Sequence, residues 1–506
     1  MIIINDIIST LSSEDQERFI VYLDRKNRRN DTKNIQLFKL LAKNELSSKD
    51  ICLKLYGSQK KDAYHALRKR LNQSIIDFIA TVNLDEEKAV DMQIIKFILA
   101  SRTFLLHKHY KIGYKILDKA EALAQEHHLF PLLNEIYHTK IQYAYAEPSL
   151  NIDDLILKFE SNQKNYYLED QLNIVYAKIR QAITKLSDKG EFISFQKLLN
   201  NTLKEYKINI TEYMSFKSLY QLMKIVSISA FATNDYFKIE PFLLETYKVL
   251  QTHKNKEKQL YYHLQVIYLI AYTLFRNKKF NQSLDFLDIM HDLMLQKQRK
   301  FYNPFKLKYN LLLALNFNFL NQQAKAITTL EPFLNIKHSD LESLLDINLS
   351  LVMMYFQERD FKKANQIFLK FYHTDKWYID KVGKEWIIKK NLIEILLHIE
   401  LQNIDLVESR LLSFKRNYFN FLKEINQQRA ITYLGLVHDY YRTPEKVTSI
   451  EFKNKVEDSF EWIGAQREDI FVMSFYAWLK SKMENQDLYK TTLDLIKQVQ
   501  QELTIT

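Results

Sequence analysis

The sequence predicts an all-α protein in which consecutive pairs of helices stack along the chain as an α-solenoid. The first observation is helical spacing: apolar residues such as Leu67, Leu71 and Ile75 recur every three or four positions. The second is the scarcity of chain breakers, with 6 glycines and 6 prolines in 506 residues and no Asn-Gly or Asp-Gly pair that would signal a β-hairpin. The third is an internal repeat with a period near 42 residues.

Residues 1–88 are expected to form a separate N-terminal helical domain. The apolar spacing predicts helices over about 14–27, 34–43, 48–56 and 62–80. Ser13-Glu14-Asp15-Gln16 fits a capping box, and Gly57 is placed to end the helix that begins at Ser48. A helix, a turn near residues 57–59 and a longer basic helix form the outline of a helix-turn-helix unit.

The basic helix over 60–72 is the candidate nucleic-acid contact. Its polar face is expected opposite Leu67 and Leu71, and the contact residues that we predict on it are His65, Arg68, Lys69 and Arg70. A recognition helix needs such a face to reach base edges, with phosphate contacts nearby. The alternative is an ordinary solvated face of an amphipathic helix. The run over 25–29 would either add phosphate contacts or complement the C-terminal end of the first helix.

Residues 89–506 carry the internal repeat. Short polar turns lead into anchor residues at Tyr110, Ile152, Phe192, Tyr236, Phe280, Gln323, Phe361, Leu406 and Leu488. Further residues three and seven positions after most anchors share one helix face with the anchor. Small residues such as Ser101 and Ala271 lie nine positions before several anchors and would let paired helices approach closely. One pair cannot bury its apolar face alone, whereas stacked pairs can.

The segments Ala271…Phe280-Asn281-Gln282-Ser283…Leu287 and Tyr355…Phe361-Lys362-Lys363-Ala364…Phe368 resemble the tetratricopeptide repeat family. The resemblance covers about 91–500 and implies a right-handed solenoid of helical hairpins. The chain departs from the family in its period, which is near 42 rather than about 34 residues. It also lacks the family's tryptophan and most of its prolines. Another α-solenoid and a compact helical bundle remain alternatives.

The resemblance also implies a concave groove lined by the first helix of each pair. Carried onto this sequence, the groove-facing positions are Lys224, Ile228, Phe231, Tyr268, Tyr272, Phe275, Leu349, Met353 and Phe356. Such a groove would hold a peptide or protein through aromatic anchors. The alternative for these positions is packing in the core, because aromatic residues at helical spacing commonly pack there.

A second basic set falls on predicted turns between helices. Its members are Lys254, Lys256, Lys258, Arg276, Lys278, Lys279, Lys297, Arg299 and Lys300. If successive turns line one edge of a solenoid, these charges would attract acidic partners. The alternative is that they are ordinary solubilising turn residues.

Catalysis and metal binding are not expected. The chain has no nucleophile elbow, phosphate-cradling loop or dinucleotide fingerprint, and its histidines lack zinc-site spacing. Cys52, the only cysteine, lies in an apolar run and fits a buried side chain in a cytoplasmic protein. No cofactor, signal peptide or membrane helix is expected. We expect a non-enzymatic scaffold for a protein or peptide, with a nucleic-acid-binding regulator as the alternative.

Overall fold

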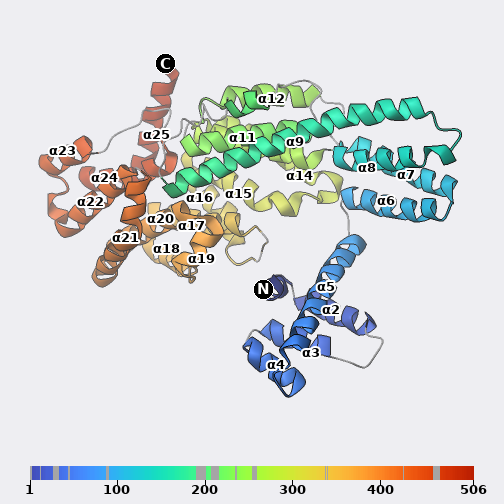
Figure 1. The fold of residues 1–506 in the computed structure, drawn as a ribbon. Helices are drawn as coiled ribbons and strands as arrows, with labels where there is room; N and C mark the ends of the chain where they lie inside the picture. The colour runs from blue at the N-terminus through green and yellow to red at the C-terminus, as the bar shows by residue number, and fades with distance from the viewer. Residues whose placement is uncertain are drawn as a thin grey trace. The chain divides into compact units, whose positions relative to one another are not determined.

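The computed structural model describes residues 3–11, 13–26, 33–43, 46–86, 90–189, 201–206, 216–233, 236–252, 259–336, 338, 340–425, 427–459 and 468–505. These residues form helices joined by turns, and no strand occurs among them (Figure 1). None of the helices formed by these residues is long and apolar enough to cross a membrane. The all-α prediction is confirmed.

The chain divides into two compact units, residues 1–163 and 164–506. The division falls inside one long helix, whereas the sequence predicts a domain boundary after residue 88. Residues 87–89, at the predicted boundary, lie outside the described part of the chain. Each unit is considered by itself below.

The N-terminal helices of the first unit share one small core. They are α1 (Ile3–Thr10), α2 (Ser13–Lys26), α3 (Lys33–Lys43), α4 (Ser48–Tyr56) and α5 (Lys61–Glu86). Phe19 is fully buried, and its ring packs against those of Phe38 and Phe78 with centroids 4.9 and 5.1 Å apart. The predicted helices are confirmed, and the last is longer than expected.

The rest of the first unit contains the first helical pair. Its elements are α6 (Val90–Leu106), α7 (Tyr110–Glu126), α8 (Phe130–Gln142), the 3-10 turn η1 (Ala144–Ala146) and the start of α9 (Ile152–Lys189). A Cβ atom on Gly113 would lie 2.7 Å from a side-chain carbon of Leu105 and 3.3 Å from the carbonyl oxygen of Ser101. The close approach of paired helices at small residues is therefore confirmed here.

Helix α9 differs from the expected pattern of two short helices joined by a turn. It runs without interruption for 38 residues. The repeat alignment requires a new pair before Phe192, but that anchor lies outside the described residues. The continuous helix shows that the period is broken over this stretch.

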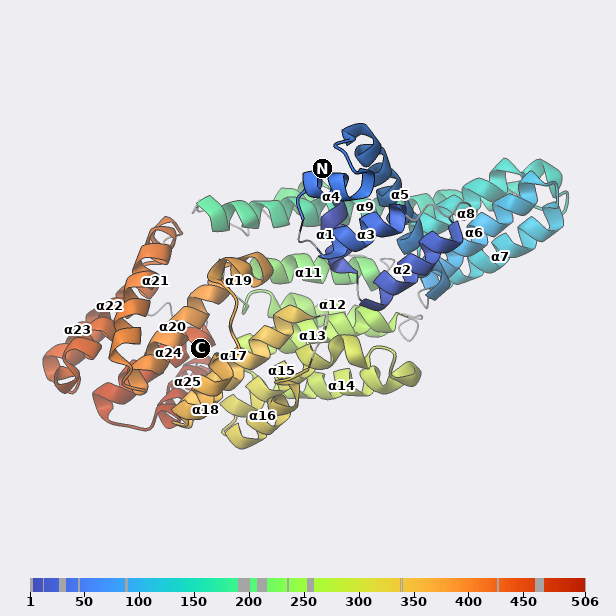
Figure 2. The ribbon, with the colours of Figure 1, turned by 90° about the horizontal axis from the view of Figure 1, so that it is seen from below.

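The second unit continues with a long series of helices (Figures 1 and 2). They are α11 (Phe216–Thr233), α12 (Glu240–Thr252), α13 (Leu260–Arg276), α14 (Phe280–Arg299), α15 (Tyr302–Phe319), α16 (Gln323–Leu330), η2 (Glu331–Phe333), α17 (Leu341–Gln357), α18 (Phe361–Phe368), α19 (Asp375–Val382), α20 (Lys384–Glu400), α21 (Ile404–Glu424), α22 (Gln428–Arg442), η3 (Pro444–Lys446), α23 (Ile450–Ser459), α24 (Ile470–Glu484) and α25 (Leu488–Ile505).

Sequential pairing in this unit is consistent with the expected helical repeats. The helices pack as α13 with α14, α15 with α16, α17 with α18, α20 with α21, and α24 with α25. The anchors Phe280, Gln323, Phe361 and Leu488 are each the first residue of the second helix of a pair. Helix α13 also packs against α15, and α15 against α17, so neighbouring pairs cover one another's apolar faces (Figure 2).

The same backbone turn ends the first helix of five pairs. One residue adopts the left-handed conformation with φ between 57° and 63°, at Lys108, Lys278, Asn321, Arg359 and Gln402. The next N–H donates to a carbonyl five residues earlier, as in His109 to Phe104 (2.8 Å) and Asp360 to Tyr355 (3.0 Å). In all five pairs the second helix starts two residues after the left-handed one, at the first residue of α7, α14, α16, α18 or α21. None of these turns uses glycine, the residue that tolerates this conformation best.

The C-terminal pair contacts more than its neighbours in sequence. The Tyr489 hydroxyl of α25 donates to the carbonyl of Asn318 at 2.6 Å, and the Gln500 amide donates to the carbonyl of Lys278 at 2.7 Å. In a simple solenoid each repeat contacts only adjacent repeats. Here α25 reaches the ends of α13 and α15, which precede it by five or more helices.

The left-handed turns predict opposite effects of two substitutions at Gln402, an exposed residue with φ 57°. We expect Gln402→Gly to raise the free energy of unfolding by up to about 1 kcal/mol, because glycine avoids the Cβ clash of this conformation. Gln402→Val should lower it by about 1 kcal/mol or more, because a β-branched side chain increases the clash. Thermal unfolding of the full chain measures both.

Asn321→Gly is the matched control for Gln402→Gly, since Asn321 has φ 61° and asparagine already tolerates this region. Its effect should be smaller than that of Gln402→Gly. Equal stability of the Gln402→Gly and Gln402→Val proteins would contradict the assignment of strain to this turn.

Candidate functional site

The helix-turn-helix outline predicted near the N-terminus is present as α4, a short turn and α5. Helix α4 begins after Ser47, whose hydroxyl accepts a hydrogen bond from the N–H of Asp50 at 3.3 Å. It ends at Gly57, which has φ 69° and donates its N–H to Leu53 at 2.8 Å. Ile51 of α4 and Leu67 of α5 are buried in the same core. The polar residues at the start of α5 therefore lie at the surface.

Three of the four predicted nucleic-acid contacts lie on the surface of α5. His65, Lys69 and Arg70 are exposed. Arg68 is half-buried, and its guanidinium donates to the side-chain oxygen of Asn5 in α1 at 3.2 Å and to the Tyr64 hydroxyl at 3.4 Å. Arg68 therefore joins α5 to α1 and is less accessible than the other three predicted contacts.

Further cations surround the exposed face of α5. The sequence prediction included the basic helix but not two exposed lysines of α4. These lysines are not on the helix face that carries the apolar residues of α4, so their exposure could have been predicted. The exposed cations of α4, the turn and α5 are Lys49, Lys54, Lys60, Lys61, Lys69 and Arg70. We call this set the N-terminal basic surface. Arg28 and Arg29 of the earlier basic run lie outside the described residues, and Lys26 forms an ion pair with Asp77 at 2.9 Å.

Cys52 is buried beneath this surface, as expected from its apolar surroundings. It borders a cavity of about 110 Å³ that is also lined by Lys49, Lys61 and His65. Its sulfur lies 3.8 Å from the carbonyl oxygen of Ser58. The cysteine serves packing between α4 and the turn.

The predicted groove residues divide between the core and its margin. Phe275 and Phe356 are fully buried and Leu349 is 8% exposed, so these three side chains belong to the hydrophobic core rather than to a free surface. The half-buried members are Lys224, Ile228, Tyr268, Tyr272 and Met353. The side chain of Phe231 lies outside the described part of the structure. The first helices of these pairs, such as α13 and α17, contact several neighbouring helices, so few of their side chains are exposed.

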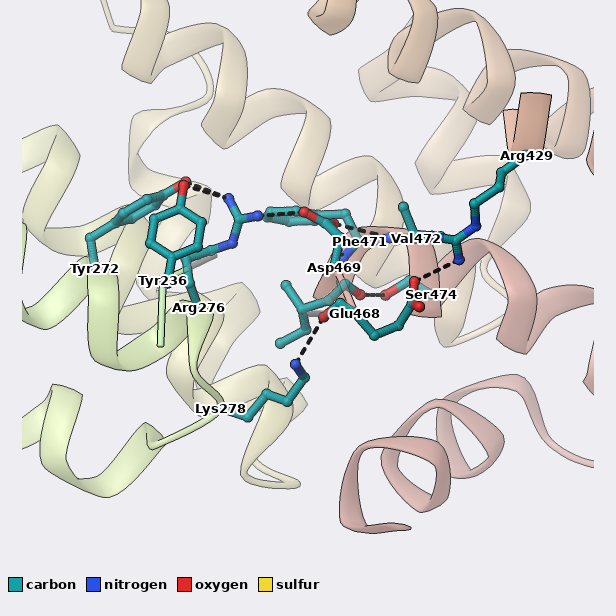
Figure 3. A network of polar contacts seen from close by, with 11 residues as sticks. Tyr236, Tyr272, Arg276, Lys278, Arg429, Glu468, Asp469, Phe471, Val472 and Ser474 are labelled. Atoms are coloured by element: carbon teal, nitrogen blue, oxygen red, sulfur yellow. Dashed lines mark hydrogen bonds and ion pairs between the residues drawn. The ribbon is translucent and has the colours of Figure 1, made fainter. Parts of the chain in front are cut away.

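Tyr272 participates in a buried polar network instead of facing an open groove (Figure 3). The Arg276 guanidinium donates to the hydroxyl of Tyr272 at 3.0 Å and to that of Tyr236 at 3.3 Å. It also forms an ion pair with Asp469 at 2.5 Å. Its central carbon lies 4.4 Å from the ring centroid of Tyr236, so the aromatic face adds a cation–π contact.

Asp469 is the acidic partner and also the N-cap of α24. Its carboxylate accepts hydrogen bonds from the N–H groups of Phe471 (2.8 Å) and Val472 (3.2 Å). Burial alone would raise the pKa of Asp469, but Arg276 and these N–H groups lower the pKa below its usual value. The ionised carboxylate therefore ties α24 to α13 across 193 sequence positions.

The turn lysines that follow Arg276 are also bound within the chain. The Lys278 ammonium is buried and donates to the carbonyl of Glu468 at 2.8 Å, and burial lowers the pKa of Lys278 to about 8. Lys279 forms an ion pair with Glu240 at 2.6 Å. These cations do not form the predicted stripe for acidic partners, because the chain's own acceptors occupy them.

The remaining members of the second basic set do not form a continuous row of exposed cations among the described residues. Lys297, Arg299 and Lys300 are exposed around a kink at the end of α14. The other members, Lys254, Lys256 and Lys258, lie outside the described residues.

An exposed aromatic cluster lies beside the first helical pair, and sequence reasoning missed it. Tyr145 is 76% exposed, and its ring centroid lies 6.3 Å from that of Tyr110 and 6.5 Å from that of Tyr143. We call these three residues the tyrosine cluster. The signal available in the sequence was the alternation of Tyr143 and Tyr145 with alanine just before Pro148, where a helix cannot continue.

Comparison with known proteins does not assign this chain to a family. No protein-family model matches the chain, and no curated protein matches it significantly. Within the described residues, no three His, Cys, Asp or Glu side chains gather in a way that could hold a metal ion.

The buried ion pair predicts a large difference between two N-terminal aspartates of neighbouring helices. Asp469→Asn should lower the free energy of unfolding by about 3–5 kcal/mol, because it leaves the buried Arg276 charge without its counterion. Asp487→Asn is the matched control, because Asp487 is exposed and its carboxylate accepts a hydrogen bond from the N–H of Lys490 at 2.9 Å. Its loss should be at most about 1 kcal/mol. Chemical denaturation of both variants measures the difference, and equal losses would contradict the role given to Arg276.

Proposed function

We propose that this chain is a non-enzymatic protein–protein interaction scaffold whose helical repeats bind a protein or peptide partner. In this proposal the repeats form a divergent, right-handed solenoid similar to tetratricopeptide repeats. The packed pairs and their common turn support it, because a preformed helical surface binds without a large ordering cost.

The tyrosine cluster is the observation that carries this proposal. Tyrosine is enriched at protein interfaces because its ring buries a large apolar area while its hydroxyl remains hydrated or hydrogen-bonded. Tyr145 exposes 76% of its surface, although the adjoining helices α7 and α8 have well-packed cores. Interaction with Tyr145 raises the pKa of Tyr110 above its usual value, in keeping with the contact between the two rings.

The cluster fits a partner that inserts an apolar or aromatic side chain between the rings. Tyr110 is the first residue of α7, and Tyr143 and Tyr145 flank and occupy η1, so all three are held by regular backbone. Binding would thus require side-chain adjustment rather than refolding.

Tyr145→Ala tests this proposal. We expect affinity purification of the full chain from its native cell to recover a specific partner, and the variant to lose about tenfold or more in affinity for it. Because Tyr145 is exposed, stability should change little. Tyr372→Ala is the control, since Tyr372 is 80% exposed in the second unit. Equal recovery of the partner by the Tyr145→Ala and original proteins would contradict the assignment.

A nucleic-acid-binding regulator is the second candidate function. The N-terminal basic surface favours it, because its cations come from both helices of the helix-turn-helix and from the turn between them. Among the side chains of these elements that the structure describes, Asp50 and Asp62 are the exposed acids, fewer than the exposed cations. In such a unit the second helix enters the major groove while flanking cations contact phosphates.

Charge reversal on α5 tests this second function. We expect the full chain to bind random duplex DNA with an affinity that falls steeply with salt, because phosphate contacts release counterions. The double variant Lys69→Glu, Arg70→Glu should abolish that binding. The double variant Lys376→Glu, Lys381→Glu makes the same charge change at exposed lysines of the second unit and should retain it. A salt-independent signal, or equal loss in both variants, would argue against the N-terminal basic surface.

A further inference from the structure

A cavity of about 300 Å³ lies within the second unit where the ends of several helices meet. Its walls come from the turn before α18, from α20, α22 and α24, and from the turn before α25. The residues that define its chemistry are Arg359, Glu400, Tyr440, Val447, Lys482 and Leu488. Neither the interaction scaffold nor the nucleic-acid function uses this cavity.

A nearly buried carboxylate provides one polar anchor. The Glu400 side chain is 10% exposed. Its Oε1 atom accepts from the indole N–H of Trp478 at 2.6 Å and pairs with the Lys482 ammonium at 2.7 Å. These contacts fix the carboxylate at the cavity wall and balance its charge, and they involve only one of its two oxygens. The Oε2 atom can accept from an N–H group of a ligand.

An arginine provides the opposite kind of anchor. Arg359 lies at the left-handed position of the turn between α17 and α18, with φ 63°. The hydrogen bond from the N–H of Asp360 to Tyr355 holds this turn, and the arginine side chain is exposed. Since Lys482 already balances Glu400, Arg359 gives the cavity a positive excess. A guanidinium pairs best with a carboxylate, which it can hold through two parallel hydrogen bonds.

Part of the remaining wall is apolar, and the rest carries the polar side chains of Thr448, Ser481, Asn485 and Gln486. Tyr440 packs edge-on against Trp478, with ring centroids 5.3 Å apart and planes at 86°. Val447 and Leu488 are each 7% exposed and complete this side. A cavity of this volume is at the small end of the range for ligand sites. It therefore suits a ligand about the size of one or two amino-acid residues.

We propose that this cavity binds a short apolar zwitterion, namely an apolar amino acid or dipeptide. The ligand carboxylate pairs with Arg359, its ammonium group donates to the Oε2 atom of Glu400, and its side chain packs on Tyr440, Val447 and Leu488. Each group of the ligand contacts a different feature of the wall. The carboxylate pairs with the excess positive charge, the ammonium group donates to the carboxylate oxygen, and the side chain packs on the apolar surface.

Isothermal titration of the full chain tests this assignment with defined probes. The probes are leucine, phenylalanine and the dipeptide Leu-Leu, each also as its C-terminal amide and as its N-acetyl derivative. We expect at least one unmodified probe to bind, with amidation and acetylation each weakening it about tenfold or more. Stronger binding of the dipeptide than of the free amino acids would identify a peptide as the ligand, and the reverse would identify an amino acid.

Variants locate the site. Arg359→Gln retains a long polar side chain and should weaken the unmodified probe about tenfold while leaving the already weak amide unchanged. Arg442→Gln is the control, because Arg442 is an exposed arginine at the end of α22 and does not line the cavity. Circular dichroism checks that both variants fold. Absence of binding at roughly 10 mM of every probe, equal binding of acid and amide, or full affinity in Arg359→Gln would overturn the proposal.

Discussion

The left-handed turn between paired helices is the constraint on which the sequential pairing of helices depends. It ends one helix and starts the next within two residues, so the two helices must fold back against each other. Close packing then requires small residues at the crossing, as at Gly113 beside Ser101 and at Ser283, whose hydroxyl donates to the carbonyl of Ala271 at 2.8 Å. In the second unit α13 packs against α15 and α15 against α17, so the apolar faces of these pairs cover one another.

Local sequence spacing was sufficient to predict this much of the fold, because the turn, the crossing and the apolar face all lie within one period. Phe280 and Phe361 begin second helices as expected. The continuous helix α9 escaped prediction because apolar residues at helical spacing look the same in one long helix as in two short ones. Only a helix-breaking residue would have distinguished them, and this chain has few.

The candidate sites were predictable only where exposure depends on a single helix. The polar face of α5 is set by its own periodicity, so His65 and Lys69 are exposed as predicted. Arg68 is instead held by Asn5, which is 63 positions away, and Arg276 by Asp469, 193 positions away. Such contacts arise from tertiary packing and leave no local pattern. The same limit explains Phe275, which faces neighbouring helices rather than a groove.

The long-range contacts also change what the net charge of +11 means. Lysines and arginines at the turns of the second unit would attract acidic partners or merely solubilise the turns, but Arg276 and Lys278 are buried against the segment that begins α24. Their charges stabilise the closure of the C-terminal pair onto α13 and contribute little to a field outside the protein. Lys60, Lys61 and Lys69, in contrast, are exposed to solvent. The proposed contact with a polyanion therefore rests on exposed cations of the N-terminal basic surface and not on the net charge of the chain.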